Sequence, residues 1–146
     1  MSLPARDPAR VAVVMARIWA GEAFPFHAAA GAWITLAGSG DGSALEIYPE
    51  GTNLVAGSVA VSFETGSAPP AIASHVAIET PLGEAELIAI AEREGWLARC
   101  CSRGPFSLIE LWVENRYLIE LLTPEMADDY RRTMTTENWR SWSESD

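Results

Sequence analysis

The fold is decided by residues 74–124, which read SHVAIETPLGEAELIAIAEREGWLARCCSRGPFSLIELWVENRYLIELLTP. Apolar side chains alternate with other side chains over 74–80, which predicts a strand. The apolar spacing over 84–94 predicts a helix, and Gly95 is placed to end it. Further strands are expected at 96–101, 106–113 and 116–122. The segment therefore predicts a βαβββ unit.

The first half of the chain repeats most of this order. Asp7 and Pro8 read as the N-cap and first position of a helix, and strands are expected over 32–37 and 44–48. Gly21 and Gly95 lie 74 positions apart, as do Glu46 and Glu120. Each glycine ends the helix of its half, and each glutamate lies in the last strand. This agreement favours an internal duplication.

The predicted fold class is α+β, with tandem βαβββ modules in one domain. A chain of 146 residues is long enough for one compact core. The expected divisions are module one (about 1–51), a linker (about 52–73), module two (about 74–124) and a C-terminal helix (about 125–146). Pro4 falls where module one would begin, so the first strand of that module is predicted to be missing or short.

The composition argues against nucleic-acid and membrane partners. Ten Lys and Arg against twenty Asp and Glu give a net charge of −10, which repels phosphate backbones. The longest apolar stretch is interrupted by Arg17 and is too short to span a bilayer. No signal peptide is recognised, so a cytoplasmic protein is expected. Adjacent Cys100 and Cys101 fit that reducing compartment as small buried side chains, with a soft-metal pair as the alternative.

Period-two geometry places one metal-ligating side chain on the same face of each of three strands. Leu45 and Ile47, for example, should pack inward, which leaves Glu46 on the face away from the helices. The same alternation puts His75 and Glu120 on that face. If the two sheets curve toward each other, one imidazole and two carboxylates converge, a donor set that suits Zn, Ni, Mn, Fe or Co. Alternatively, Glu46 and Glu120 are solvated surface carboxylates and His75 is a hydrogen-bonded structural histidine.

The same cavity would carry aromatic walls for a small organic molecule. The residues expected there are Tyr48, Trp112, Trp33 and Glu110. Alternatively, the tryptophans only fill the sheet and Glu110 is solvated. Arg103 and Arg116 are expected in turns, either as solvated residues or as residues that steer an acidic substrate.

The segments SHVAIET, NRYLIELLTP and ALEIYPEG resemble the vicinal oxygen chelate superfamily, which includes glyoxalase I, extradiol dioxygenases, fosfomycin-resistance enzymes and bleomycin-binding proteins. The resemblance implies a divalent metal held by Glu46, His75 and Glu120. It also implies that a displaced Glu46 or Glu120 acts as the catalytic base, and that a homodimer shares its sites between chains. A fourth ligand would come from the first strand of module one, where this sequence departs from the pattern.

Three functions remain open on the sequence. The first is a metal-dependent lyase, isomerase or dioxygenase in which the metal polarises oxygen atoms of a small substrate. The second is a metal-free protein that sequesters a small molecule, as bleomycin-resistance proteins do. The third is a structural dimer with an incomplete site, which a large separation between Glu46 and Glu120 would favour.

Overall fold

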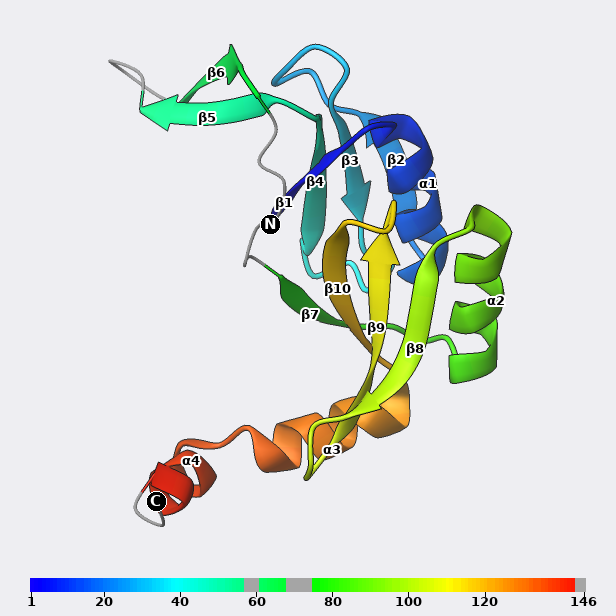
Figure 1. The fold of residues 1–146 in the computed structure, drawn as a ribbon, viewed down its shortest axis with the longest axis vertical. Helices are drawn as coiled ribbons and strands as arrows, with labels where there is room; N and C mark the ends of the chain where they lie inside the picture. Colours follow the sequence, from blue (N-terminus) through cyan, green and yellow to red (C-terminus); the bar gives the residue numbers. More distant parts are fainter. Residues whose placement is uncertain (57–60, 68–74, 144–146) are drawn as a thin grey trace.

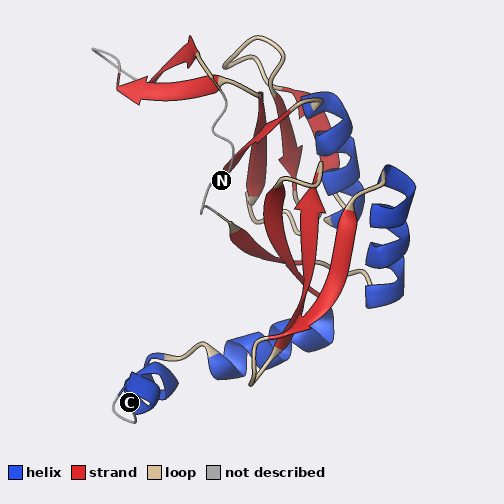
Figure 2. Cartoon of the chain, viewed as in Figure 1, coloured by secondary structure: helices blue, strands red, loops and turns tan. Residues whose placement is uncertain are grey.

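The computed structural model describes residues 1–56, 61–67 and 75–143. Within these ranges the chain forms two four-stranded sheets, a separate two-stranded hairpin and four helices (Figures 1 and 2). The two sheets have the same internal order, and each belongs to one half of the sequence. The predicted α+β class is confirmed.

Module one contains β1 (Ser2–Ala5), α1 (Pro8–Ile18), β2 (Glu22–Pro25), β3 (Trp33–Leu36) and β4 (Ala44–Pro49). Its sheet has the order β1-β4-β3-β2, with β1 parallel to β4. The first strand, predicted to be missing or short, is present with four residues. It lies at the sheet edge, where strands tolerate a proline such as Pro4. Helix α1 begins as predicted, because the Asp7 carboxylate accepts the Arg10 N–H.

Module two contains β7 (Val76–Glu79), α2 (Glu84–Glu94), β8 (Leu97–Ser102), β9 (Ser107–Val113) and β10 (Tyr117–Leu122). Its sheet has the order β7-β10-β9-β8, with β7 parallel to β10. Helix α2 ends at Gly95, whose φ of 71° is the left-handed conformation that glycine adopts without strain. The topology of module one is therefore repeated strand for strand.

Two further parts project from the sheets (Figure 1). Strands β5 (Thr52–Ala56) and β6 (Val61–Thr65) form an antiparallel hairpin inside the expected linker. Residues 57–60 and 68–74 of that linker lie outside the described residues. The expected C-terminal helix is divided into α3 (Pro124–Thr133) and α4 (Thr136–Ser143). In the described part of the chain no helix is long and apolar enough to cross a membrane.

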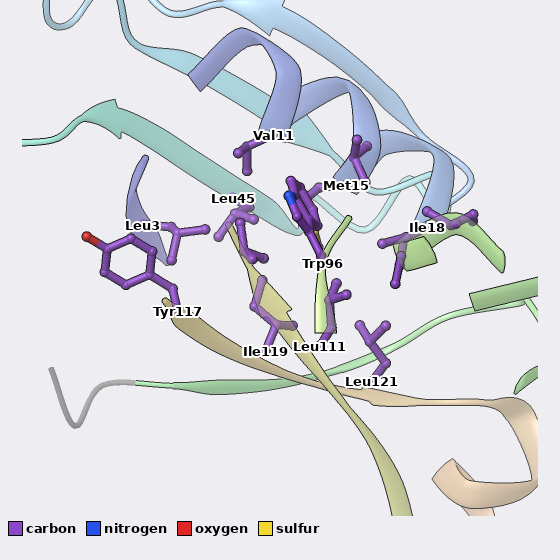
Figure 3. Packing of buried hydrophobic residues seen from close by; sticks show 14 of the residues in the cluster. Leu3, Val11, Met15, Ile18, Leu45, Trp96, Leu111, Tyr117, Ile119 and Leu121 are labelled. Carbon is purple, nitrogen blue, oxygen red and sulfur yellow. The ribbon is translucent and has the colours of Figure 1, made fainter. Parts of the chain in front are cut away.

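The helix-facing sides of both sheets contribute to one hydrophobic core (Figure 3). Leu45 of β4 and Ile119 and Leu121 of β10 lie in the same cluster as Val11 and Met15 of α1. These strand residues alternate with the predicted site residues. Glu46 and Glu120 therefore lie on the outer sides of their sheets, away from the helices.

Polar contacts fix the two modules to each other. Glu50, directly after β4, forms an ion pair with Arg116, directly before β10. The Glu114 carboxylate accepts the backbone N–H groups of Arg6 and Asp7 at 2.7 and 3.0 Å. These contacts join the entry to α1 with the β9–β10 turn, so they set the relative orientation of the two sheets.

Candidate functional site

The outer face of the second sheet carries two carboxylates side by side. Glu110 of β9 and Glu120 of β10 are direct partners in the antiparallel register, so their side chains point to the same side. Glu110 is only 6% exposed, and the Glu120 side chain is 14% exposed. Two carboxylates held so close and so little exposed require positive charge beside them.

Two arginines supply that charge. Arg103 Nη2 lies 2.7 Å from Glu110 Oε1 and 3.1 Å from Glu120 Oε1, so one guanidinium bridges both carboxylates. Arg99 Nη2 lies 2.8 Å from Glu110 Oε2, and the Trp112 indole N–H lies 3.3 Å from the same oxygen. The hydrogen bond from Arg103, reinforced by Arg99 and Trp112, outweighs burial and lowers the pKa of Glu110 to about 2.

Arg99 was not predicted as a site residue, although a usable signal was present. It lies on β8 directly opposite Glu110 in the antiparallel register. The expected strands 96–101 and 106–113 already formed a hairpin, and pairing their residues across the turn would have brought Arg99 to Glu110. Arg103 was expected to be a solvated or substrate-steering turn residue. It instead pairs with two carboxylates of the sheet.

His75 and Glu120 are brought together as predicted. His75 Nε2 lies 4.0 Å from Glu120 Oε2, and His75 directly precedes β7, the parallel neighbour of β10. The Glu120 carboxylate therefore lies between the His75 imidazole and the Arg103 guanidinium. Helix α3 covers the neighbouring part of this face through Leu108 and Leu122, which leaves the charged part open.

Glu46 and Tyr48 form a separate pair on the outer face of the first sheet. The Tyr48 hydroxyl donates a hydrogen bond of 2.8 Å to Glu46 Oε2. The Tyr48 ring packs against Phe26 and Phe63, with centroid separations of 6.2 and 5.4 Å. Burial, followed by the contact with Glu46, raises the pKa of Tyr48 to about 12. Tyr48 is thus a neutral hydrogen-bond donor to the Glu46 carboxylate.

Trp33 lies on the other side of the first sheet from Glu46. Its register partner is Ile47, a fully buried core residue, and the Trp33 side chain packs against the shared core. The expectation that Trp33 lines the same cavity as Tyr48 is therefore corrected. Thr35, two residues further along β3, is buried on the same side and donates a hydrogen bond to the Ala12 carbonyl oxygen of α1, so this side of β3 faces the helix.

The predicted three-ligand cluster is not assembled within one chain. The described residues contain no group of three or more His, Cys, Asp or Glu side chains that could hold a metal ion. The physical reason is the shared core: both sheets turn their helix-facing sides inward, which leaves Glu46 and Glu120 on separate outer faces. Taken alone, this chain offers His75 and Glu120 as donors, and Arg103 already contacts Glu120. The described residues of a single chain therefore do not supply the three donors that were predicted for a metal.

A cavity of about 1080 Å³ does lie between the modules, but its lining differs from the prediction. One wall is β7 with the start of α3, and the other is the end of α1 with the β3–β4 turn. Trp19 and Ile78 are among its apolar residues, and Glu79 and Arg131 are among its charged ones. The lining, drawn from described residues, includes none of the predicted ligands or cavity residues. The charged outer face, where the ligand-type residues gather, is therefore the better candidate site.

Comparison with known proteins gives a likeness in structure only. No family model and no curated protein matches the sequence. Among solved structures, the fosfomycin resistance protein FosX from Mesorhizobium loti has a TM-score of 0.54 at 13% identity, over 88% of this chain and 92% of that one. FosX from Listeria monocytogenes, complexed with Mn(II) and sulfate, has a TM-score of 0.56 at 13% identity, over 90% and 92%. The chain has the glyoxalase-like fold of tandem βαβββ modules.

Protein ATC0852 from Agrobacterium tumefaciens has a similar structure, with a TM-score of 0.58 at 9% identity. The aligned part covers 84% of this chain and 93% of that one. The resemblance inferred from SHVAIET, NRYLIELLTP and ALEIYPEG is confirmed at the level of fold. At such identities the comparison establishes the arrangement of the two βαβββ modules. The chemistry has to be argued from this chain's own residues.

Proposed function

We propose that this protein binds a small, oxygen-bearing organic molecule on the outer face of its second sheet. The observation that carries the proposal is the Glu110–Arg103–Glu120 bridge, a set of ionised side chains kept in place on a partly open sheet face. Arg99 has a side chain that is 57% exposed, so its N–H groups are accessible to oxygen atoms of a ligand. The Trp112 side chain on the same face supplies an aromatic surface.

The chemistry of the structural neighbours suggests probes for this face. One neighbour, a FosX variant from Listeria monocytogenes, is complexed with Mn(II) and 1S,2S-dihydroxypropylphosphonic acid. Phosphonate oxygens match the planar N–H groups of a guanidinium, which often binds such groups through two parallel hydrogen bonds. Fosfomycin and dihydroxypropylphosphonic acid are therefore suitable first ligands for this chain.

A divalent metal is the second candidate, and the His75–Glu120 contact favours it. The third donor would be Glu46 of a second copy, because the Glu46 of the same chain lies on another face. This arrangement requires a homodimer in which the outer face of the first sheet of one protomer packs against the outer face of the second sheet of its partner. A bound metal would allow the protein to catalyse a reaction of the predicted lyase, isomerase or dioxygenase class, with Glu46 or Glu120 as the base. The cytoplasm remains the proposed compartment.

The small-molecule proposal is tested by two-dimensional ¹H–¹⁵N NMR with fosfomycin and dihydroxypropylphosphonic acid as probes. Trp112→Phe identifies the indole N–H signal of Trp112 and leaves the other tryptophans as internal references. Saturable shifts of that signal and of β8 amides, weakened by Arg99→Gln, are expected. Shifts confined to the cavity between the modules would contradict the proposed location, and no shifts at millimolar probe would contradict the ligand class.

The metal candidate is tested by elemental analysis after incubation with Mn(II) and with Zn(II), beside sedimentation measurements of the oligomeric state. One ion per chain in a dimer, lost in both His75→Ala and Glu46→Gln, is the expected result. Retention of the ion in Glu46→Gln would remove Glu46 from the ligand set.

A further inference from the structure

We infer that the ligand of the second sheet is an acid with an apolar substituent of the size of an aromatic ring. The acid group lies at Arg99, and the substituent packs on an apolar row formed by Leu97, Trp112 and Leu118. This class of ligand is narrower than the small molecule proposed above, on which the inference rests.

The registers of the second sheet divide its outer face into rows that run across the strands. Leu97 of β8 is the partner of Trp112 of β9, and Trp112 is also the partner of Leu118 of β10. Two residues further along β8, Arg99 is the partner of Glu110. Residues two apart on a strand share a face and lie about 7 Å from each other. The apolar row therefore runs directly beside the charged residues.

The apolar row is accessible from solvent. Leu97 is 48% exposed, and Trp112 and Leu118 are half-buried. In the described part of the chain, none of the three belongs to either core cluster. On the other side of the charged residues, by contrast, helix α3 packs over Leu108 and Leu122. The fold thus covers one apolar side of the charged residues with a helix and leaves the other side accessible.

Trp112 is held in position before a ligand binds. Its indole N–H lies 3.3 Å from Glu110 Oε2, so the polar edge of the ring is turned toward the charged residues. Glu110 is itself fixed by ion pairs with Arg103 and Arg99. A ring that is already oriented loses little conformational freedom when a ligand packs on it, and this favours binding.

The spacing of the rows sets the size of the ligand. The Arg99 side chain is 57% exposed, so it can donate hydrogen bonds to an acid group. The apolar row begins one step of about 7 Å further along the strand. An aromatic ring attached directly to the acid group spans this step, whereas a methyl group is too short. Since contact with the row removes apolar surface from water, the affinity should rise with the larger substituent.

The experiment compares methylphosphonate with phenylphosphonate, which carry the same acid group, by isothermal titration calorimetry of the full chain. Phenylphosphonate should bind the wild type at least about tenfold more tightly than methylphosphonate. In the double variant Leu97→Ser with Leu118→Ser, the ratio of the two affinities should fall below about threefold. Arg99→Gln should weaken the binding of both phosphonates and leave their ratio unchanged.

Leu36→Ser is the matched control. Leu36 is 41% exposed, close to the 48% of Leu97, and it lies on the outer face of the first sheet opposite Ala44. The control removes the same apolar side chain at a similar exposure, so the affinity ratio should remain that of the wild type. Circular dichroism of each variant verifies that the fold is unchanged.

Three outcomes would overturn the inference. Equal affinities of the two phosphonates for the wild type would show that the apolar row contributes nothing, although the small-molecule proposal would stand. An affinity ratio that is the same in the wild type and the double variant would place the aromatic ring elsewhere on the protein. If neither phosphonate binds at millimolar concentration, the inference and the phosphonate class of ligand are both wrong.

Discussion

The stability of the protein should depend on pH through Glu110. The contacts with Arg103, Arg99 and Trp112 lower the pKa of Glu110 from 4.5 to about 2. The folded protein thus favours the ionised form, and this stabilisation is fully present above about pH 4.5. It is lost as the pH falls toward 2, where the folded state also takes up the proton. One pKa unit corresponds to about 1.4 kcal/mol. Because the Arg99 side chain is more than half exposed, solvent screens its contribution, and the expected loss in the free energy of unfolding is about 2–3 kcal/mol.

Glu110→Gln removes this pH dependence, and urea unfolding followed by circular dichroism measures it. The free energy of unfolding of the wild type should exceed that of Glu110→Gln most at pH 5–7. The difference should shrink by about 2–3 kcal/mol between pH 4.5 and pH 2. Glu79→Gln is the control, because Glu79 pairs with Arg131 at an exposed position and should contribute little. A difference between wild type and Glu110→Gln that stays constant from pH 7 to pH 2 would refute the reasoning.

Two further predictions concern other parts of the fold. Tyr48→Phe should remove from an ultraviolet titration the tyrosine that ionises near pH 12. It should also lower the free energy of unfolding by about 0.5–1.5 kcal/mol, because the hydrogen bond to Glu46 is lost. An unchanged titration would contradict the assignment. Gly21→Ala should cost more than about 2 kcal/mol in chemical unfolding, since the new Cβ would lie 1.9 Å from the Leu36 carbonyl oxygen. Gly83→Ala, whose Cβ would meet Glu86 Oε2 at 3.7 Å, should cost far less, and equal losses would refute the steric argument.

Local patterns were sufficient to predict most of the fold. Helix α2 was predicted over its observed range, because its apolar spacing and Gly95 are both signals within a few residues. Strand β1 was harder to predict, since a segment of four residues containing Pro4 shows almost no alternation. It is a strand because β4 lies beside it in parallel register, an interaction between residues more than forty positions apart.

The candidate site was predicted only as far as single strands allow. Alternation within a strand assigns Glu46 and Glu120 to the face away from the helices, whereas His75 lies just before β7. Whether those faces meet depends on how the two sheets pack, and the shared core that separates them could not be inferred from periodicity. The bridge by Arg103 was missed for a related reason: a turn residue has no preferred face, and a long side chain can return to the sheet.

The single core also determines how the protein unfolds. Leu45 and Ile119 come from different βαβββ units, yet they are buried in one cluster with Val11 and Met15. Neither unit can expose its share of this cluster without removing the apolar neighbours of the other. Denaturation should therefore be one cooperative transition for both sheets, and a fragment ending after the first sheet would carry an uncovered hydrophobic face. In this protein the two βαβββ halves are thermodynamically inseparable.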